Sequence, residues 1–306
     1  MKLLLALAVA VSLAPARAQE TPAADKLVLT NNGKPMKLEV TCGNPEIDRF
    51  GLTCSLDEPC PLYLELAAVE AAGDKIFASG NLHTDKSTVA SVLLASSDGG
   101  KTWTEPHPRL EGATLDLMQF IDLEVGWVSG EQAGALPRDP FFLLTTNGGK
   151  TWVRRPVFSE TRVGMIDQFW FESRTAGAMT VDRTQTGDSG GRYELFESMT
   201  GGESWMLRQV STKPVVLKKG RPPGPGTWRV RADGATKSFN IEKRGSAQWS
   251  PVASFLITVG DCRPAEPVLT EPEAAPPAKT EPEASGVFRL PGAPADDAPK
   301  KPKRKK

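Results

Sequence analysis

Four acidic side chains are the residues of this chain whose type and position best suit chemistry. Asp116, Asp122, Asp167 and Glu172 lie on or beside apolar segments that we expect to be inner strands of a sheet. Glycoside hydrolysis needs two carboxyl groups about 5 to 9.5 Å apart, one of which donates a proton while the other acts as base or nucleophile. The strands that carry these acids therefore decide whether such a pair forms.

Three copies of one short string indicate where the strands turn. The strings SSDGGKTW (96–103), TTNGGKTW (145–152) and SMTGGESW (198–205) end in tryptophans that recur about every fifty residues. Paired glycines supply the positive φ angles of a tight hairpin, and the polar residue before them can bond nearby backbone groups. We call these segments the repeat turns and expect structural roles for Ser96, Asp98, Gly100, Thr102, Trp103, Thr145, Asn147, Gly149, Thr151, Trp152, Ser198, Thr200, Gly202, Ser204 and Trp205.

Three apolar segments precede each repeat turn, and a fourth strand should begin at its tryptophan. First strands are expected at 62–66, 115–121 and 165–171, second strands at 75–80, 125–130 and 175–181, and third strands at 89–95, 141–144 and 192–197. Four short strands repeated at this period are typical of a β-propeller blade. We therefore expect an all-β protein: a small β-propeller of about four blades, each a four-stranded antiparallel sheet.

A worn fourth copy at 236–249 keeps the tryptophan but loses the acidic residue and the second glycine. Residues 226–232 would be the second strand of this unit. The repeats then run from 62 to 262 and form either a four-bladed ring or a partial ring. In the second case the ring is completed by the N-terminal segment 19–61, whose apolar residues alternate as in strands.

The repeat turns resemble the bacterial neuraminidase repeat, or Asp-box, whose pattern is Ser/Thr-x-Asp-x-Gly-x-Thr-Trp. The first copy matches it fully, the second has Asn147 in place of the acid, and the third is looser. Asp-boxes occur in sialidases, sorting receptors and the photosystem II assembly factor family, whose members also tend to carry a Gly-Trp phrase such as the one at Trp127. The resemblance implies a propeller fold, with the boxes on outer turns away from the central pocket.

A sialidase-like centre needs an arginine triad and a tyrosine nucleophile activated by a glutamate, as the resemblance implies. The chain has only two tyrosines, and Tyr193 and Glu194 are neighbours on one expected strand, so their side chains point to opposite faces. The arginines that could converge are Arg138, Arg183 and Arg208. We expect no catalytic residues, and a sialidase-like glycoside hydrolase or a carbohydrate-binding protein is the alternative.

Four cysteines fit an exported protein, because disulfides persist in oxidising compartments. Three pairings are open; we favour Cys60 with Cys262, which flank the repeats, and Cys42 with Cys54. A zinc site is the competing idea, but the chain has no C-x-x-C spacing and only two histidines. We therefore expect neither a metal nor another cofactor.

The two ends of the chain differ in composition from the middle. Residues 1–18 carry a basic start, an apolar run and small residues before a cleavage point, which is typical of a secretory signal peptide. Residues 263–306 are rich in proline, alanine and glutamate and should be disordered. A basic cluster that begins at Lys300 and ends at Lys306 could touch an anionic polymer or membrane surface, without specific nucleic-acid recognition.

Together these features predict a noncatalytic binding or assembly scaffold that is exported to the periplasm or cell exterior. We expect a protein partner to meet residues on loops or strand ends, with Trp170, Arg138 and Arg221 as candidates. Trp170 stands out because it lies between two phenylalanines on one strand, so that its side chain faces away from theirs.

Overall fold

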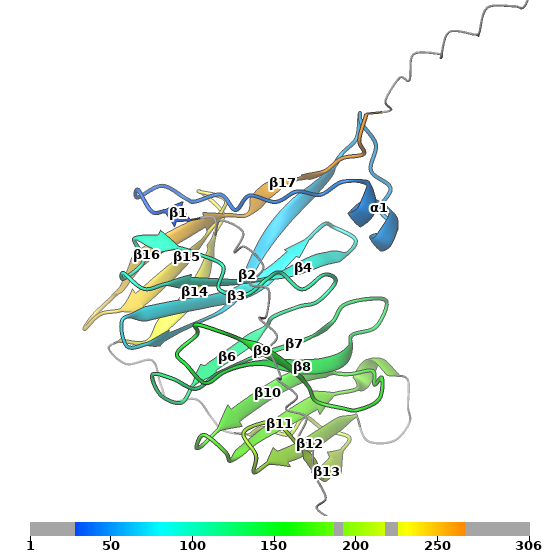
Figure 1. The fold of residues 1–306 in the computed structure, drawn as a ribbon, viewed down its shortest axis with the longest axis vertical. Coiled ribbons are helices and arrows are strands. Elements are labelled where there is room, and N and C mark those ends of the chain that lie inside the picture. The colour runs from blue at the N-terminus through cyan, green and yellow to red at the C-terminus, as the bar shows by residue number, and fades with distance from the viewer. Residues whose placement is uncertain (1–27, 187–191, 218–225, 267–306) are drawn as a thin grey trace, which may run out of the picture. The chain divides into compact units, whose positions relative to one another are not determined.

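The structure, a computed structural model, describes residues 28–186, 192–217 and 226–266 (Figure 1). The chain divides into the units Met1–Glu266 and Pro267–Lys306, and all described residues belong to the first. The predicted signal peptide, Arg221 and the basic cluster at Lys300 lie outside the described residues, as does most of the predicted disordered tail.

The described chain is built almost entirely of antiparallel sheets. Three sheets have four strands each: β17 (Thr258–Cys262), β2 (Cys60–Ala72), β3 (Lys75–His83) and β4 (Thr88–Ser96); β6 (Leu117–Phe120), β7 (Gly126–Gln132), β8 (Arg138–Thr145) and β9 (Val153–Pro156); and β10 (Met165–Phe171), β11 (Gly177–Asp182), β12 (Tyr193–Ser198) and β13 (Met206–Ser211). A fourth sheet has β14 (Trp228–Asp233), β15 (Ser238–Arg244) and β16 (Trp249–Leu256). The expected all-β class is thereby confirmed, and the expected four-stranded antiparallel sheets are confirmed for three of these four sheets.

Short elements complete the fold. The strands β1 (Leu29–Thr30) and β5 (Thr102–Trp103) pair with each other, α1 (Asn44–Phe50) is a single α-helix of two turns, and one 3-10 turn spans Thr184–Thr186. The prediction that the fourth strand of the first sheet begins at Trp103 is wrong, because β5 ends there and pairs with β1. The fourth strand of the first sheet is instead β17, which lies on the far side of β2.

The prediction that residues 226–232 form the second strand of the fourth unit is also wrong. They contain the start of β14, which is a first strand: Trp228 lines the same pocket as residues of β2, β6 and β10. The edge of β16 that would meet a fourth strand is taken by the N-terminal segment. Met36 pairs with it in parallel, donating its N–H to Ser254 O at 2.8 Å and accepting from Leu256 N at 2.8 Å.

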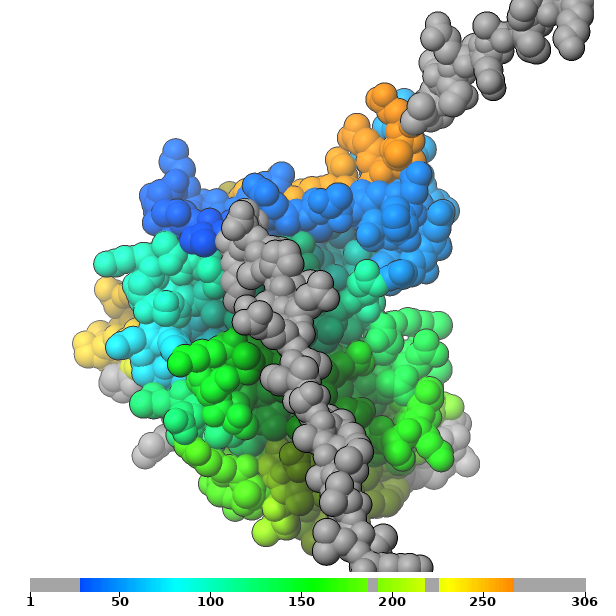
Figure 2. All heavy atoms as spheres, in the orientation of Figure 1, coloured from blue at the N-terminus to red at the C-terminus, as the bar shows by residue number. Residues whose placement is uncertain are grey.

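Two disulfides join Cys42 to Cys262 and Cys54 to Cys60, so the favoured pairing is wrong. Cys60 begins β2 and Cys262 ends β17, and the two residues are partners in the pairing of these strands. They therefore lie side by side at one end of the first sheet. The N-terminal segment also runs past this point, where Arg263 N donates to Cys42 O, and each strand cysteine bonds to that segment instead. In Figure 2 the N-terminal segment, in blue, runs along the top of the molecule, and the last described residues, in orange, lie near its right-hand end.

Three apolar cores join the four sheets. The first joins the first and fourth sheets and the N-terminal segment, the second joins the first and second sheets, and the third joins the second and third sheets. Their largest members are Trp103 and Phe255; Trp152, Phe77 and Phe141; and Trp127, Phe142, Phe171 and Phe196. In the described part of the chain, no fourth core joins the third sheet to the fourth.

The repeat turns are held by their polar residues. In the first, Asp98 accepts from the hydroxyl of Thr102 at 2.7 Å and from its N–H at 2.9 Å, while Ser96 Oγ accepts from Gly100 N at 2.8 Å. Both glycines have positive φ, 75° at Gly99 and 91° at Gly100. Hydrogen bonds from Thr102, Ser96 and Lys101 lower the pKa of Asp98 to about 2. The turn therefore favours the ionised acid.

Each repeat turn also packs against a neighbouring sheet. Gly100 lies against Val252 of the fourth sheet, Gly149 lies against the ring of Phe77 in the first, and Gly201 O accepts from Trp127 Nε1 of the second at 2.8 Å. A side chain at Gly100 or Gly149 would collide with these neighbours. The turns are therefore contacts between sheets as well as chain reversals.

We expect Asp98→Ala to lower the melting temperature, because four hydrogen bonds to the carboxylate are lost. Asp98→Asn should have a smaller effect, since Asn147 holds the same place in the second turn and accepts from Thr151 N at 3.0 Å. The folded pKa of Asp98 lies below the ordinary 3.8, so its contribution is present above pH 3.8 and is lost as the pH falls towards 2. Thermal unfolding followed by circular dichroism at pH 7 and pH 2 measures this, and equal melting temperatures for all three proteins at pH 7 would contradict it.

Candidate functional site

In the first and second sheets, one position in the second strand receives the next repeat turn. This position pairs with the residue just before the sheet's own turn: Phe77 with Ala95, Trp127 with Leu144, and Ala178 with Glu197. Phe77 and Trp127 are large, buried and covered by the turns at Gly149 and Gly201. Ala178 is small, and among the described residues no repeat turn packs on it.

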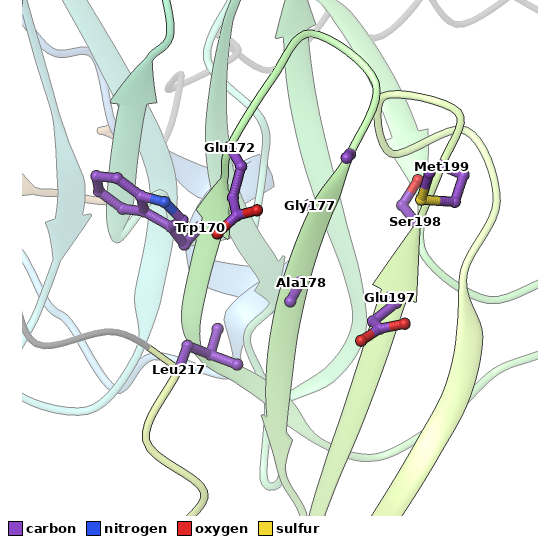
Figure 3. A pocket seen from close by; sticks show the side chains of 9 residues that line it. Trp170, Glu172, Gly177, Ala178, Glu197, Ser198, Met199 and Leu217 are labelled. Atoms are coloured by element: carbon purple, nitrogen blue, oxygen red, sulfur yellow. The ribbon is translucent and has the colours of Figure 1, made fainter.

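A pocket of about 300 Å³ lies at this position on the third sheet. Trp170, Glu172, Ala178, Glu197, Met199 and Leu217 are among its lining residues. Figure 3 shows Trp170 on one strand, with Glu172 just beyond the end of that strand, Glu197 on another, and Ala178 on the strand between them. We call this the third-sheet pocket; its floor is formed by small residues of β11, and its walls carry an indole, a thioether and two carboxylates.

Trp170 faces this pocket because of strand alternation. Phe169 and Phe171 point into the third core, where Phe171 stacks on Trp127 with ring centroids 3.7 Å apart. The side chain of Trp170 emerges on the opposite face and is 39% exposed. Met199 and Met206 nearby in the third sheet are 70% and 59% exposed. The expected alternation around Trp170 is confirmed, and its face of the sheet carries exposed apolar side chains beside the carboxylates of the third-sheet pocket.

A second pocket, of about 500 Å³, is lined by the first strands of all four sheets. Its residues come from Ala67 to Glu70 of β2, Asp116 to Gln119 at β6, Asp167 to Trp170 of β10 and Trp228 to Val230 of β14. We call it the central pocket. Trp170 and Leu217 line both pockets, so the two are neighbours around one tryptophan.

Three carboxylates face the central pocket: Glu70, Asp116 and Asp167. Burial raises the pKa of Glu70 to about 7, although a hydrogen bond from the Ala71 backbone opposes the shift. Arg229 is the single arginine of the lining, and its guanidinium forms an ion pair with Glu242 at 2.7 Å. Among the described residues, none of the three carboxylates forms an ion pair.

Asp116 forms a carboxyl pair with the buried Glu131. Glu131 on β7 is 6% exposed, and burial together with the charge of Asp116 raises the pKa of Glu131 to about 8. Asp116 accepts from Thr114 Oγ1 at 2.7 Å and from Asn81 Nδ2 at 3.3 Å. At neutral pH the pair therefore holds a proton, with Glu131 as its main carrier.

Buried amides tie the strands of neighbouring sheets together at this centre. Gln119 on β6 bonds both backbone groups of Phe171 on β10, accepting from its N at 2.8 Å and donating to its O at 2.9 Å. Asn81 on β3 accepts from Leu115 N at 2.8 Å. These bonds fix β6 relative to β10 and β3, and hence fix the places of Asp116 and Asp167.

The four acids singled out from sequence separate into three environments. Asp116 and Asp167 line the central pocket, whereas Glu172 lines the third-sheet pocket. Asp122 lies in a turn, where N–H groups of Val125 and Glu124 and the side chain of Arg174 lower its pKa. The sequence reasoning missed Glu70 and Glu131. A signal existed for Glu70, which interrupts the apolar alternation of β2.

The arginines and tyrosines of a sialidase-like centre lie apart from one another. Arg183 and Arg162 bind the buried Glu194 at 3.1 and 2.6 Å, and Arg208 binds Glu197 at 2.7 Å. Arg138 begins β8 beside Asp139 and lies in the lining of neither pocket in the described structure. Tyr63 packs beside His83, with ring centroids 5.8 Å apart.

The described residues contain no group of three or more histidine, cysteine, aspartate or glutamate side chains suited to hold a metal ion. None of the helices in the described ranges is long and apolar enough to cross a membrane.

No protein-family model and no curated protein sequence matches the chain. Among solved structures it is similar to one described as "YCF48 bound to D1 peptide", with a TM-score of 0.33 and 16% sequence identity. The alignment covers 62% of this chain and 57% of that chain, so this chain spans less than two thirds of the length of that protein.

Proposed function

We propose that the chain is a four-bladed, Asp-box-type β-propeller that serves as a noncatalytic binding or assembly scaffold for a protein partner. The observation that carries this proposal is the third-sheet pocket. Phe77 and Trp127 each receive a repeat turn, whereas the equivalent Ala178 lies in an open pocket beside Trp170. Since the fourth repeat has lost its turn sequence, a segment of a partner takes that place.

The proposed place of action is an oxidising compartment outside the cytosol. Two disulfides support it, because such bonds persist where glutathione does not reduce them. The signal-peptide pattern at 1–18 points the same way. Periplasmic or extracellular location is part of the proposal.

A site-specific photo-crosslinker in place of Met199 tests the scaffold role in the native host. We expect one discrete protein adduct at this position, because Met199 borders the third-sheet pocket and is 70% exposed. The matched control carries the crosslinker in place of Leu123, which is 66% exposed but lies outside both pockets. Trp170→Ala should abolish the adduct at 199, and equal adducts at both positions, or none, would count against the proposal.

Glycoside hydrolysis is the second candidate, and Glu70 is the observation that favours it. A carboxyl with a pKa of about 7 suits a general acid, and the carboxyl groups of Asp116 and Asp167 line the same pocket. Hydrolysis of fluorogenic glycosides by the purified protein, abolished by Glu70→Gln, would establish this activity in place of the scaffold.

A further inference from the structure

Resting on the proposed scaffold function, we infer that the third-sheet and central pockets together bind an extended, basic segment of a partner protein. The segment would place lysine or arginine side chains in the central pocket and an apolar side chain on Ala178. The contiguous lining carries five carboxylates, Glu70, Asp116, Asp167, Glu172 and Glu197, and one arginine; of these acids, Glu197 is already paired with Arg208 at 2.7 Å.

Charge selects the ligand in the central pocket. Arg229 is already neutralised by Glu242, and Arg231 binds the same carboxylate at 2.9 Å, so neither balances the pocket acids. Glu70 lies on β2, Asp116 precedes β6 and Asp167 lies on β10, so their charges reach the pocket from three sheets. A basic side chain among them would supply the missing counter-charge, and would favour the ionised form of Glu70.

Aromatic and thioether groups also favour a ligand that carries basic and apolar side chains. Trp170 lines both pockets, and Trp228 also lines the central one, where Lys243 Nζ already lies 5.3 Å from its ring centroid. The face of an indole attracts the guanidinium of arginine or the ammonium of lysine. Met199 and Met206 are flexible apolar side chains that adapt to varied partner residues. The surface therefore suits mixed basic and apolar sequence.

An extended conformation follows from the shape of the lining. The two pockets share Trp170 and Leu217, so a ligand that fills both passes along β10 instead of entering one deep hole. Successive side chains of an extended strand point to opposite sides, and alternate residues lie about 7 Å apart. Alternate basic and apolar residues can thus reach the two pockets from one backbone.

Fluorescence anisotropy of the full chain with a labelled peptide of about nine residues tests the inference. The probe contains lysine, arginine, leucine and glycine, and the control peptide has glutamate at every basic position. We expect saturable binding of the basic peptide, and at least tenfold weaker binding by the double variant Glu70→Gln, Asp167→Asn. Trp170→Ala should weaken binding to a similar extent.

A matched double variant distinguishes an effect of the pocket carboxyl groups on affinity from an effect of the protein's net charge. Asp57→Asn with Glu160→Gln removes the same number of carboxyl groups from exposed positions outside both pockets. Its affinity should stay within twofold of the parent. Melting temperatures of both doubles report whether they remain folded. Equal weakening by the two doubles, or equal binding of the glutamate peptide, would overturn the inference.

The chain's own basic cluster, from Lys300 to Lys306, is the competing occupant. A full-length variant with glutamine at the six basic positions of this cluster should bind the peptide as the parent does. A rise in affinity of tenfold or more would assign the pockets to the tail and overturn the inference. Failure of the peptide to bind while the adduct at position 199 persists would refute the basic ligand but leave the scaffold function standing.

Discussion

Replacement of Cys42 and Cys262 by alanine lowers the free energy of unfolding by about 5 kcal/mol. This bridge spans 220 residues, and a cross-link that closes so long a loop removes much of the conformational entropy of the unfolded chain. In the folded state it fixes the N-terminal segment, whose Met36 covers the edge of β16 and whose Asn31 amide bonds Gly100 O and Val252 O. Both halves of the bridge are buried in the first core.

The other disulfide is the matched control. Cys54–Cys60 spans only six residues, so its removal should cost roughly 2 kcal/mol by the same loop argument. Urea denaturation of the parent and the two double variants under non-reducing conditions measures both losses. Equal losses of unfolding free energy for the two pairs, or a larger loss for Cys54 and Cys60, would contradict the prediction. Loop length would then not determine how much each disulfide stabilises the protein.

Glu131→Gln stabilises the protein at pH 8 by roughly 2 to 4 kcal/mol and leaves its stability at pH 5 nearly unchanged. In the parent, the folded pKa of Glu131 is about 8 against an ordinary 4.5. Between these values the folded state binds more protons than the unfolded state, so stability falls as the pH rises through this range. Glutamine keeps a neutral donor towards Asp116 and has no proton to lose.

Urea midpoints at pH 5, 6.5 and 8 measure the difference. Glu160→Gln, at an exposed position, is the control and should leave the pH dependence of the parent intact. The stability of the Glu131 variant still falls somewhat as the pH rises, because Glu70 also has a raised folded pKa, of about 7. A parent protein that is more stable at pH 8 than at pH 5 would contradict the assignment of a neutral Glu131.

Local sequence was sufficient to predict much of the fold. Strand β10 was predicted with its observed bounds, and the positive φ values lie at the predicted paired glycines of all three repeat turns. Turn chemistry depends on residues within about four positions of one another, and strand alternation depends on neighbours, so both can be read from the chain. The worn fourth copy was located, but its strands were assigned one position too late in the unit, so that the first strand was predicted to be the second. The missing glycine and acid left no local marker of where the unit begins.

The candidate site could be predicted only in part. Trp170, Asp116 and Asp167 were identified from their strands, yet their meeting with Glu70 depends on four first strands that are far apart in sequence. Arg138 was chosen as a loop residue and lies in neither pocket lining of the described structure. Glu131 was missed because its raised pKa arises from burial and from Asp116, which is on a different strand.

By itself the sequence determined the repeat, the turns, the all-β class and the face on which each strand residue lies, because all four follow from short-range sterics and hydrogen bonding. Tertiary structure decided which cysteines pair, where the N-terminal segment lies, and which acids share a pocket. Those outcomes depend on contacts between residues up to 220 positions apart, such as Cys42 and Cys262. Such contacts form only when the sheets pack, and no local pattern encodes them.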